Sequence, residues 1–408
     1  MAATTAAQDP SPFRKFIKSE SPFLKDIGQH TAVSHADDAV IRLPQINKLI
    51  ANWQQASKEP LKGVTRDGNI RPNLFQLADD ELDVEAIVDA AEHLLSTLTS
   101  EQKAKTLLDF DAPEKRMWQN THLYVPMSRF GIRLDEVKPE VLTQALELLK
   151  ATLSPEGYEK AIIATETNHF LGTLYNGHGI LNRFSYNLAI FGTPSTTEPW
   201  AYTFFGHHLC LSIFLRGKHI EITPTFMGAE PNMIDEGPLA GTQLYIPEQE
   251  LALKFMRGLS PELRKTAQAS TTLDRAPGHQ GAPWRAVCGA FQDNAVIQPE
   301  GLQLGLALMK GQRDLILQII EQFVIYLPEK ARSRRVRQAE KDMFETYFTW
   351  AGGFGEEDPF YYRIHGPTII VEFEHCPSIF LGNTKAERFH IHTHVRTPNG
   401  GDYGHALV

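Results

Sequence analysis

Cysteine is scarce in this sequence, and the few cysteines present form no recognisable pair. Cys210, Cys288 and Cys376 are the three cysteines, and they lie far apart along the chain. A disulfide framework needs an even set of cysteines, and a cysteine-based zinc module needs close pairs such as CxxC. The sequence therefore disfavours both and favours a reducing compartment.

Long apolar runs and an excess of positive charge are also missing. No stretch approaches the roughly 18 uninterrupted apolar residues of a membrane span, and the start, MAATTAAQDPSPFRKF, lacks a signal-peptide core. The net charge of −9 argues against attraction to nucleic acid or anionic membranes. The basic run Lys330–Lys341 is interpreted as a solvated helix face, with a phosphate or acidic-partner patch as the alternative. We therefore expect a cytoplasmic protein with no nucleic-acid partner and no membrane partner.

Several catalytic motifs are absent as well. The sequence has no GxSxG nucleophile elbow, no Walker loop, no GxGxxG after a predicted strand and no HExxH. These absences argue against a serine hydrolase, a nucleotide kinase, a Rossmann-type NAD enzyme and a helix-based zinc protease.

Helical periodicity and two β regions together predict the fold class. Helices are expected at 83–98, from Thr99, at 139–152, from Ser154, from Ser260 and at 315–327. Two regions, 184–242 and 360–395, have strand patterns instead. We therefore expect an α+β fold with a mainly helical N-terminal portion and a mixed or antiparallel sheet or barrel-like core that carries histidine-rich strands.

The domain division that follows from this pattern has three parts. Residues 1–45 are expected to form an irregular N-terminal arm, and 46–160 are expected to form the mainly helical portion. Residues 161–408 are expected to form the α+β portion with the chemistry-bearing strands. A chain of 408 residues also allows the last two parts to form one continuous domain.

The strongest chemical signal is the segment ERFHIHTHVRTP, residues 387–398, which has a histidine at every second position. Because side chains alternate along a strand, His390, His392 and His394 project from one face. Neighbours in such a row are about 7 Å apart, close enough for two rings to bind one ion, whereas the outer pair is about twice as far apart. We therefore predict His390 and His392 as metal ligands and His394 as a supporting or exposed residue. The alternative is a histidine-rich strand that faces solvent.

Carboxylates occupy the corresponding face of a neighbouring predicted strand. In PTIIVEFEH, Glu372 and Glu374 lie opposite an apolar face, and a hairpin with the histidine strand would bring one of them to the histidine row. Imidazole and carboxylate ligands together suit iron, copper and zinc. We predict Glu372 as a ligand or catalytic group and iron as the ion, with zinc and copper as alternatives.

A second pair, His207 and His208, lies where an upstream hairpin is expected, with its turn near Gly217. Pairing of Leu215 with Lys218 would place four polar side chains on one face: His208, Ser212, His219 and Glu221. We predict His207 and His208 as candidate ligands, of which only one can face the site. A buried histidine bonded to the backbone explains the pair equally well.

Two further polar residues are candidates for catalysis. Arg363 could clamp a substrate carboxylate, with an ordinary salt bridge as the alternative, and Asp402 could orient a ligating imidazole. The isolated histidines are expected to be structural: His122, His169, His178, His279 and His365.

Seven stretches give the chain a resemblance to a known family. They are FGTPS (191–195), EPW (198–200), GHHLCLS (206–212), TPTFMGAEP (223–231), FYYRIHGPTIIVEFEH (360–375), FHIHT (389–393) and GGDYG (400–404). Through them, most of the chain after the N-terminal arm resembles the uncharacterised family catalogued as domain of unknown function, number 3500. The resemblance places these candidates in family-typical motifs: His207, His208, Glu372, His390, His392 and Asp402. It names no reaction, and it marks His219, His375 and His394 as features of a subset.

These observations predict a metal-dependent enzyme. We expect a mononuclear non-haem, iron-type oxygenase or oxidase that acts on a small organic acid or an aromatic metabolite. A zinc-dependent hydrolase or decarboxylase is the first alternative, and a non-catalytic ligand-binding protein is the second. The expected partner is a small-molecule substrate, and the sequence is also compatible with a homo-oligomer.

Overall fold

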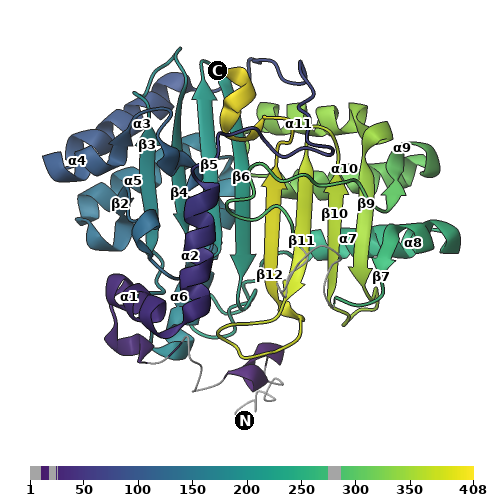
Figure 1. Cartoon of the computed structure of the whole chain (residues 1–408), viewed down its shortest axis with the longest axis horizontal. Helices are drawn as coiled ribbons and strands as arrows, with labels where there is room; N and C mark the ends of the chain where they lie inside the picture. Colours follow the sequence, from purple (N-terminus) through teal and green to yellow (C-terminus); the bar gives the residue numbers. More distant parts are fainter. Residues whose placement is uncertain (1–10, 18–23, 25, 274–285) are drawn as a thin grey trace, which may run out of the picture.

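The computed structural model describes residues 11–17, 24, 26–273 and 286–408. The strands of these residues form one mixed, open, 12-stranded sheet (Figure 1). The expected α+β class with a helical N-terminal part is confirmed, and the sheet does not close into a barrel. Among the described residues, no helix combines the length and the apolar character needed to cross a bilayer.

Eight longer strands and four very short ones make up the sheet. The longer strands are β3 (Tyr186–Phe191), β4 (Trp200–Gly206), β5 (Leu209–Arg216), β6 (His219–Ala229), β9 (Tyr347–Gly352), β10 (Phe360–His365), β11 (Ile370–Cys376) and β12 (Glu387–Arg396). The short strands are β1 (Leu107–Leu108), β2 (Ile132–Arg133), β7 (Gln268–Ser270) and β8 (Leu302–Gln303). Their order across the sheet is β1-β3-β4-β5-β6-β12-β11-β10-β9-β7, with β2 beside β3 and β8 beside β9.

The helices flank these strands. They are α1 (Ala32–Arg42), α2 (Pro44–Ala56), α3 (Val84–Thr97), α4 (Ser100–Thr106), α5 (Pro139–Thr152), α6 (Pro155–Tyr175), α7 (Ile246–Gly258), α8 (Pro261–Ala267), α9 (Leu304–Ala307), α10 (Lys310–Phe323) and α11 (Glu329–Lys341). The helices expected at 83–98 and 139–152 are found as α3 and α5, whereas the one expected at 315–327 is α10 and begins earlier.

The sheet consists of two halves with the same order of elements. Apart from α9 and 3-10 turns, α3-α4-β1-β2-α5-α6-β3-β4-β5-β6 is followed by α7-α8-β7-β8-α10-α11-β9-β10-β11-β12. In each half, one short strand runs parallel to the first long strand and the other runs antiparallel to it. The halves meet where β6 pairs antiparallel with β12, a junction that we call the seam and that lies in the middle of the sheet (Figure 1).

A glycine recurs at the same place in both halves, just before β2 and β8. Gly131 has φ of 74° and Gly301 has φ of 88°. A Cβ at either position would lie 2.3 Å from a carbonyl oxygen of the adjoining long strand, that of Leu188 or Phe348. Both positions therefore require glycine, because a side chain would clash and the backbone is left-handed.

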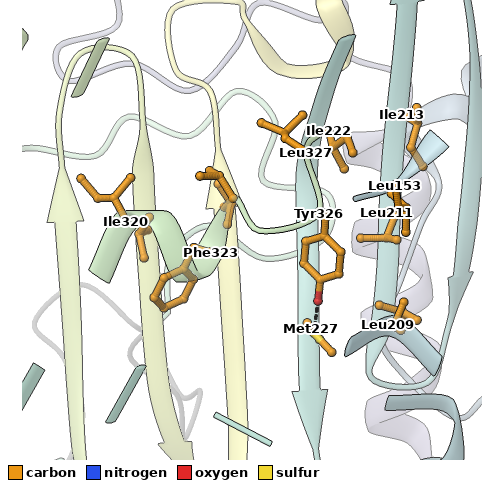
Figure 2. Packing of buried hydrophobic residues seen from close by; sticks show 14 of the residues in the cluster. Leu153, Leu209, Leu211, Ile213, Ile222, Met227, Ile320, Phe323, Tyr326 and Leu327 are labelled. Atoms are coloured by element: carbon orange, nitrogen blue, oxygen red, sulfur yellow. Dashed lines mark hydrogen bonds between the residues drawn. The ribbon is translucent and has the colours of Figure 1, made fainter. Parts of the chain in front are cut away.

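The main hydrophobic core lies between the sheet and the helices of both halves. Figure 2 shows Leu209, Leu211 and Ile213 of β5 on the same side as Ile320 and Phe323 of α10 and the following Tyr326. Each of these side chains stabilises the fold by about 1.5–3 kcal/mol when it is removed from water. The Tyr326 hydroxyl donates a hydrogen bond to the Met227 sulfur of β6, so that the segment after α10 is fixed to the seam.

The opposite face of the sheet is covered mainly by irregular segments. A second cluster there joins Trp118 and Phe130 to Phe226 and to Tyr403 near the C-terminus. Figure 1 shows α2 in front of β5. The even-numbered side chains of β12 project to this face, because the alternating Ile391 and Val395 belong to the helix-side core.

Two segments differ from the structure that we predicted from the sequence. Residues 32–42, within the arm expected to be irregular, form α1, because Thr31 and Ser34 make a capping box and Ala36 packs against Leu123. The rest of that arm at 1–10, 18–23 and 25 lies outside the described residues, as does His279. The basic run forms α11, but Arg335 is buried there, so this helix face is not solvated throughout.

Candidate metal centre

His208 reaches the site from the tight turn between β4 and β5, of which His207 and His208 are the two residues. The φ of His208 is 60°, a left-handed conformation that is uncommon for residues other than glycine. The His208 carbonyl accepts a 2.9 Å hydrogen bond from the Gly228 N–H of β6. A Cβ on Gly228 would lie 2.7 Å from the His208 ring, so glycine at that position makes room for the imidazole.

His390 and His392 come from the middle of β12. This strand pairs His392 with Gly228 of β6 on one side and with Glu374 of β11 on the other. The Nε2 atom of His392 lies 3.3 Å from that of His208 and 3.1 Å from that of His390. The candidate ligand atoms of the three histidines all lie within 4.8 Å of one another.

These separations suit a shared metal ion. A neutral imidazole Nε2 has either one N–H or one lone pair, so His392 Nε2 cannot form a well-shaped hydrogen bond with both neighbours. Two imidazole nitrogens on one tetrahedral ion, each about 2.0–2.1 Å from the metal, are about 3.3 Å apart. The trio could therefore supply three ligands to one ion.

Burial keeps these imidazoles neutral. Removal from water holds the pKa of His208 and of His392 well below the usual range, and neighbouring histidines lower it further. Burial also lowers the pKa of His390, although the Glu230 carboxylate opposes this shift. Neutral imidazoles present their lone pairs to a cation without having to release a proton.

Glu230 is a residue of the site that sequence reasoning missed. Its Oε2 lies 3.6 Å from His390 Nε2. Its Oε1 accepts hydrogen bonds of 3.0 Å from the N–H groups of Phe380 and Leu381 and a further one from the Ser378 hydroxyl. The available signal was its position in TPTFMGAEP, directly after β6. One carboxylate oxygen is thus anchored, and the other is directed at the histidines.

His207 lies beside the trio. Its ring stacks on that of His208 with 3.9 Å between centroids, and its Nδ1 lies 2.8 Å from Asn168 Oδ1, to which it donates. Burial lowers the pKa of His207 to about 3. Two further histidine rings lie beyond His207. The ring centroids of His207 and His122 are 5.9 Å apart, and those of His122 and His35 are 5.3 Å apart.

The carboxylates of β11 have a different environment from the trio. β11 and β12 form the expected hairpin, which pairs Glu372 with His394. The Glu372 carboxylate accepts hydrogen bonds from the Val287 N–H (3.0 Å), the Cys288 N–H (2.8 Å) and the Tyr361 hydroxyl (2.7 Å). Its distance to His394 Nδ1 is 4.0 Å, and it does not belong to the group of converging ligand atoms. Glu372 therefore fixes a loop to the sheet in this structure.

The two other predicted catalytic residues also form protein contacts. Arg363 lies 3.4 Å from the Tyr361 hydroxyl and 3.7 Å from the Glu300 carboxylate. Asp402 accepts hydrogen bonds from the Thr397 N–H (2.7 Å) and from Arg396 (3.2 Å), and burial raises its pKa to about 6. Neither residue lines the cavity that contains the trio.

The β5–β6 hairpin differs from the expected register. Arg216 pairs with His219, so Gly217, with φ of 55°, and Lys218 form the turn instead of a pairing of Leu215 with Lys218. His219 therefore lies at the end of β6 remote from Gly228, where its Nδ1 accepts a 3.0 Å hydrogen bond from the Ala78 N–H.

A cavity of about 290 Å³ includes the trio in its wall. Its other polar walls come from His122, His207, Glu230, Glu374, His394, Asn120 and Thr121. Its apolar walls come from Ile46, Leu49 and Trp53 of α2, together with Leu123, Ile379, Phe380 and the alanines and glycine of 286–290. The trio can therefore meet a small molecule inside the protein.

Comparison with known proteins identifies a family and no reaction. The family described as protein of unknown function (DUF3500) matches residues 80–405. The search of curated proteins and the search of solved structures both found no match. Because the family match covers most of the chain, the chain belongs to the DUF3500 family.

Proposed function

We propose that this member of the DUF3500 family is an enzyme that uses one divalent metal ion held by His208, His390 and His392. The observation that carries the proposal is the spacing of the Nε2 atoms, 3.1 Å and 3.3 Å around His392. Imidazole ligands suit iron, copper and zinc. With three neutral ligands, such an ion keeps its full charge and can polarise a substrate oxygen or a water molecule.

An iron-type oxygenase or oxidase is the reaction class that we favour. The cavity is mostly apolar, which suits both O₂ and an aromatic substrate, and three protein ligands leave coordination positions for them. In this scheme the protein excludes water, orients the substrate against the ion and holds Glu230 next to His390.

Zinc-dependent hydrolysis or decarboxylation is the second candidate, and Glu230 is the observation that favours it. A carboxylate near an open zinc position can accept a proton from a water molecule, and the anchored Oε1 leaves Oε2 available for this role.

Metal analysis of the full chain, purified without a histidine tag, tests the proposal. We expect about one equivalent of metal in the wild type and less than about a tenth in His390→Ala and His392→Ala, since each variant loses a ligand. His394→Asn is the matched control, because it removes the next histidine of the same strand face and leaves the trio complete. Unchanged metal content in both ligand variants would refute the metal centre. Consumption of O₂ by an iron- or copper-loaded protein separates the first reaction class from the second.

A further inference from the structure

His207 is a residue of the metal centre to which the proposed function gives no role. Its ring lines the same cavity of about 290 Å³ as the trio and stacks on the ring of His208, with 3.9 Å between centroids. It does not belong to the group of converging ligand atoms. Ligand pockets contain a few placed polar groups that fix the orientation of the bound molecule, and His207 has the location of such a group.

Asn168 of α6 determines which ring nitrogen of His207 carries the hydrogen. The Asn168 amide nitrogen Nδ2 donates to the Asn182 carbonyl at 2.9 Å and to the Ser185 hydroxyl at 3.0 Å. Because a carbonyl oxygen can only accept, the amide nitrogen must lie on that side, and the amide oxygen Oδ1 must face His207. The 2.8 Å contact between Oδ1 and His207 Nδ1 therefore requires a hydrogen on Nδ1.

The second ring nitrogen of His207, Nε2, is left as a hydrogen-bond acceptor. The ring is buried between the imidazoles of His208 and His122, an environment that disfavours a second proton. A neutral imidazole with its hydrogen on Nδ1 has a lone pair on Nε2. Among the described residues, this Nε2 has no hydrogen-bond partner. Because Nδ1 faces Asn168, which does not line the cavity, Nε2 is the nitrogen that can face it.

We infer that His207 Nε2 accepts a hydrogen bond from a hydroxyl or N–H group of the molecule that binds in the cavity, and that Asn168 is the positioning residue that keeps this lone pair available. The inference rests on the proposed function and deepens it, because it adds a hydrogen-bond donor to the small molecule expected beside the ion. A site with a buried acceptor discriminates against an analogue that lacks the donor, since the acceptor then stays unpaired. The two adjacent histidines thus divide the work: His208 binds the ion and His207 binds the substrate.

Long-range proton–nitrogen NMR spectra of the isotope-labelled full chain test the tautomer directly. We expect the His207 ring to show a protonated Nδ1 and an unprotonated Nε2, with its signals assigned by their loss in His207→Phe. Asn168→Leu removes the acceptor for Nδ1 and should allow both tautomers. Asn168→Asp keeps an acceptor and should retain the wild-type pattern. A hydrogen on Nε2 in the wild type overturns the inference.

Phenol and fluorobenzene test the contact with a bound molecule, because they are similar in size and only phenol has a donor. The full chain, loaded with one equivalent of zinc, is titrated with each probe and binding is followed by ligand-observed NMR. We expect phenol to bind at least about tenfold more tightly than fluorobenzene in the wild type. The two should bind about equally in His207→Phe, which keeps an aromatic ring beside His208 but has no acceptor. A difference that persists in His207→Phe overturns the inference, and so does failure of phenol to bind.

Further variants separate the positioning role from the contact itself. Asn168→Leu should reduce the difference between the two probes and Asn168→Asp should keep it, whereas equal effects of the two changes overturn the role of Asn168. His178→Phe is the control, because this histidine is exposed and does not line the cavity, and it should leave the difference unchanged.

Zinc content, measured in every sample, distinguishes failure of the inference from failure of the proposed function. Absence of zinc binding by the wild type refutes the proposed function. Loss of zinc in His207→Phe identifies His207 as a ligand and overturns the inference. Zinc bound without discrimination between the two probes in the wild type refutes the inference alone.

Discussion

The two ends of the seam between β6 and β12 have opposite chemical character. At one end, the β4–β5 turn brings His208 to His390 and His392, where neutral imidazole nitrogens converge. At the other end, the β10–β11 turn carries Thr368, whose carbonyl accepts a 3.2 Å hydrogen bond from Arg335. The same arrangement of strands thus has a guanidinium at one end and three converging imidazole nitrogens at the other.

Ion pairs and hydrogen bonds of α11 surround the end of the seam near Thr368. Arg334 donates to Asp80 and to Glu221, both at 2.8 Å, and Arg335 donates to the Thr397 hydroxyl at 2.9 Å. Burial raises the pKa of Glu221, but the guanidiniums of Arg335 and Arg334 outweigh this effect and hold it well below the usual range. The comparison teaches that the side chains packed around each end of the seam, and not the sheet topology, decide which end is filled by ion pairs and which end can take a ligand.

The largest expected effect comes from breaking the ion-paired end. Arg334→Leu removes the guanidinium that bonds to both of the buried carboxylates Asp80 and Glu221, so the free energy of unfolding should fall by about 3 kcal/mol or more. Lys330→Leu, which removes an exposed ion pair with Glu81 from the same helix, should cost less than about 1 kcal/mol. Urea titration measures both values. Similar losses in the two variants would remove the distinction between the buried pairs and the exposed one.

Removal of His208, the candidate ligand on the β4–β5 turn, should lower metal affinity at the end of the seam that carries the trio, whereas Arg334→Leu lowers stability at the other end. His208→Gly deletes one imidazole but suits the left-handed backbone, so zinc affinity should fall by more than about a hundredfold. Because relief of backbone strain offsets part of the lost packing, the zinc-free chain should still unfold cooperatively. Thr368→Gly at the opposite turn is the control, and it should leave zinc affinity unchanged. Competition with a chromogenic chelator measures the affinity, and equal affinities in the two variants would contradict the comparison.

As the pH falls, the buried histidines near the trio should lower the free energy of unfolding before the ion pairs at the other end of the seam do. Burial lowers the pKa of His35 to about 4, whereas an unfolded histidine has a pKa of about 6.5. Between these values the unfolded chain takes up a proton that the folded chain does not, so stability falls as the pH falls from 6.5 toward 4. The loss at pH 5 is about 2 kcal/mol for this one group.

His35→Leu should remove this contribution, so that the free energy of unfolding falls less between pH 7 and pH 5 than it does in the wild type, by the same amount. Glu221, with its lowered pKa, loses its contribution only as the pH falls below the range of ordinary carboxylates. Urea titrations at three pH values provide the measurement. If the free energy of unfolding of His35→Leu changes with pH as it does in the wild type, His35 is not neutral in the folded protein.

The smallest expected effect concerns the carboxylate next to the trio. Glu230→Gln keeps an oxygen to accept the Phe380 and Leu381 N–H groups but removes the negative charge 3.6 Å from His390. Zinc affinity should fall by about tenfold, because the variant loses a carboxylate that lies beside the ligand atoms and offsets the charge of the ion. Glu236→Gln, at a half-exposed carboxylate paired with Arg14, should have no effect. A loss as large as that of His208→Gly would instead identify Glu230 as a ligand.

The regular parts of this molecule could be predicted from sequence because they repeat with a period. Alternation in β5, β11 and β12 indicated strands, and the row of His390, His392 and His394 on one face followed from the same period of two. Helices such as α3 and α5 were evident from apolar spacing and, for α5, from an initial proline. The duplicated order of elements was missed, because β1, β2 and β8 have two residues each and show no period.

The parts of the site that could not be predicted depend on long-range contacts. Glu372 and Glu374 of β11 both accept hydrogen bonds from one loop, Glu372 from the N–H groups of Val287 and Cys288 and Glu374 from that of Ala286. That loop has no periodic pattern, so the sequence did not predict these contacts. Glu230 comes after the last alternating residue of β6, so no period indicates where its side chain points. The basic run suggested a solvated face, but the spacing of charges does not reveal that Arg334 reaches a carboxylate 254 positions earlier in the chain.

The origin of the three imidazoles in different halves of the sheet has a mechanical consequence. His208 and His392 are 184 positions apart in sequence, and each belongs to one of the two duplicated units. A cation bound by both histidines would cross-link the two units, and its removal would break that link. A chelator should therefore loosen the junction of the two units as well as remove reactivity, and neither unit expressed by itself should retain the cation.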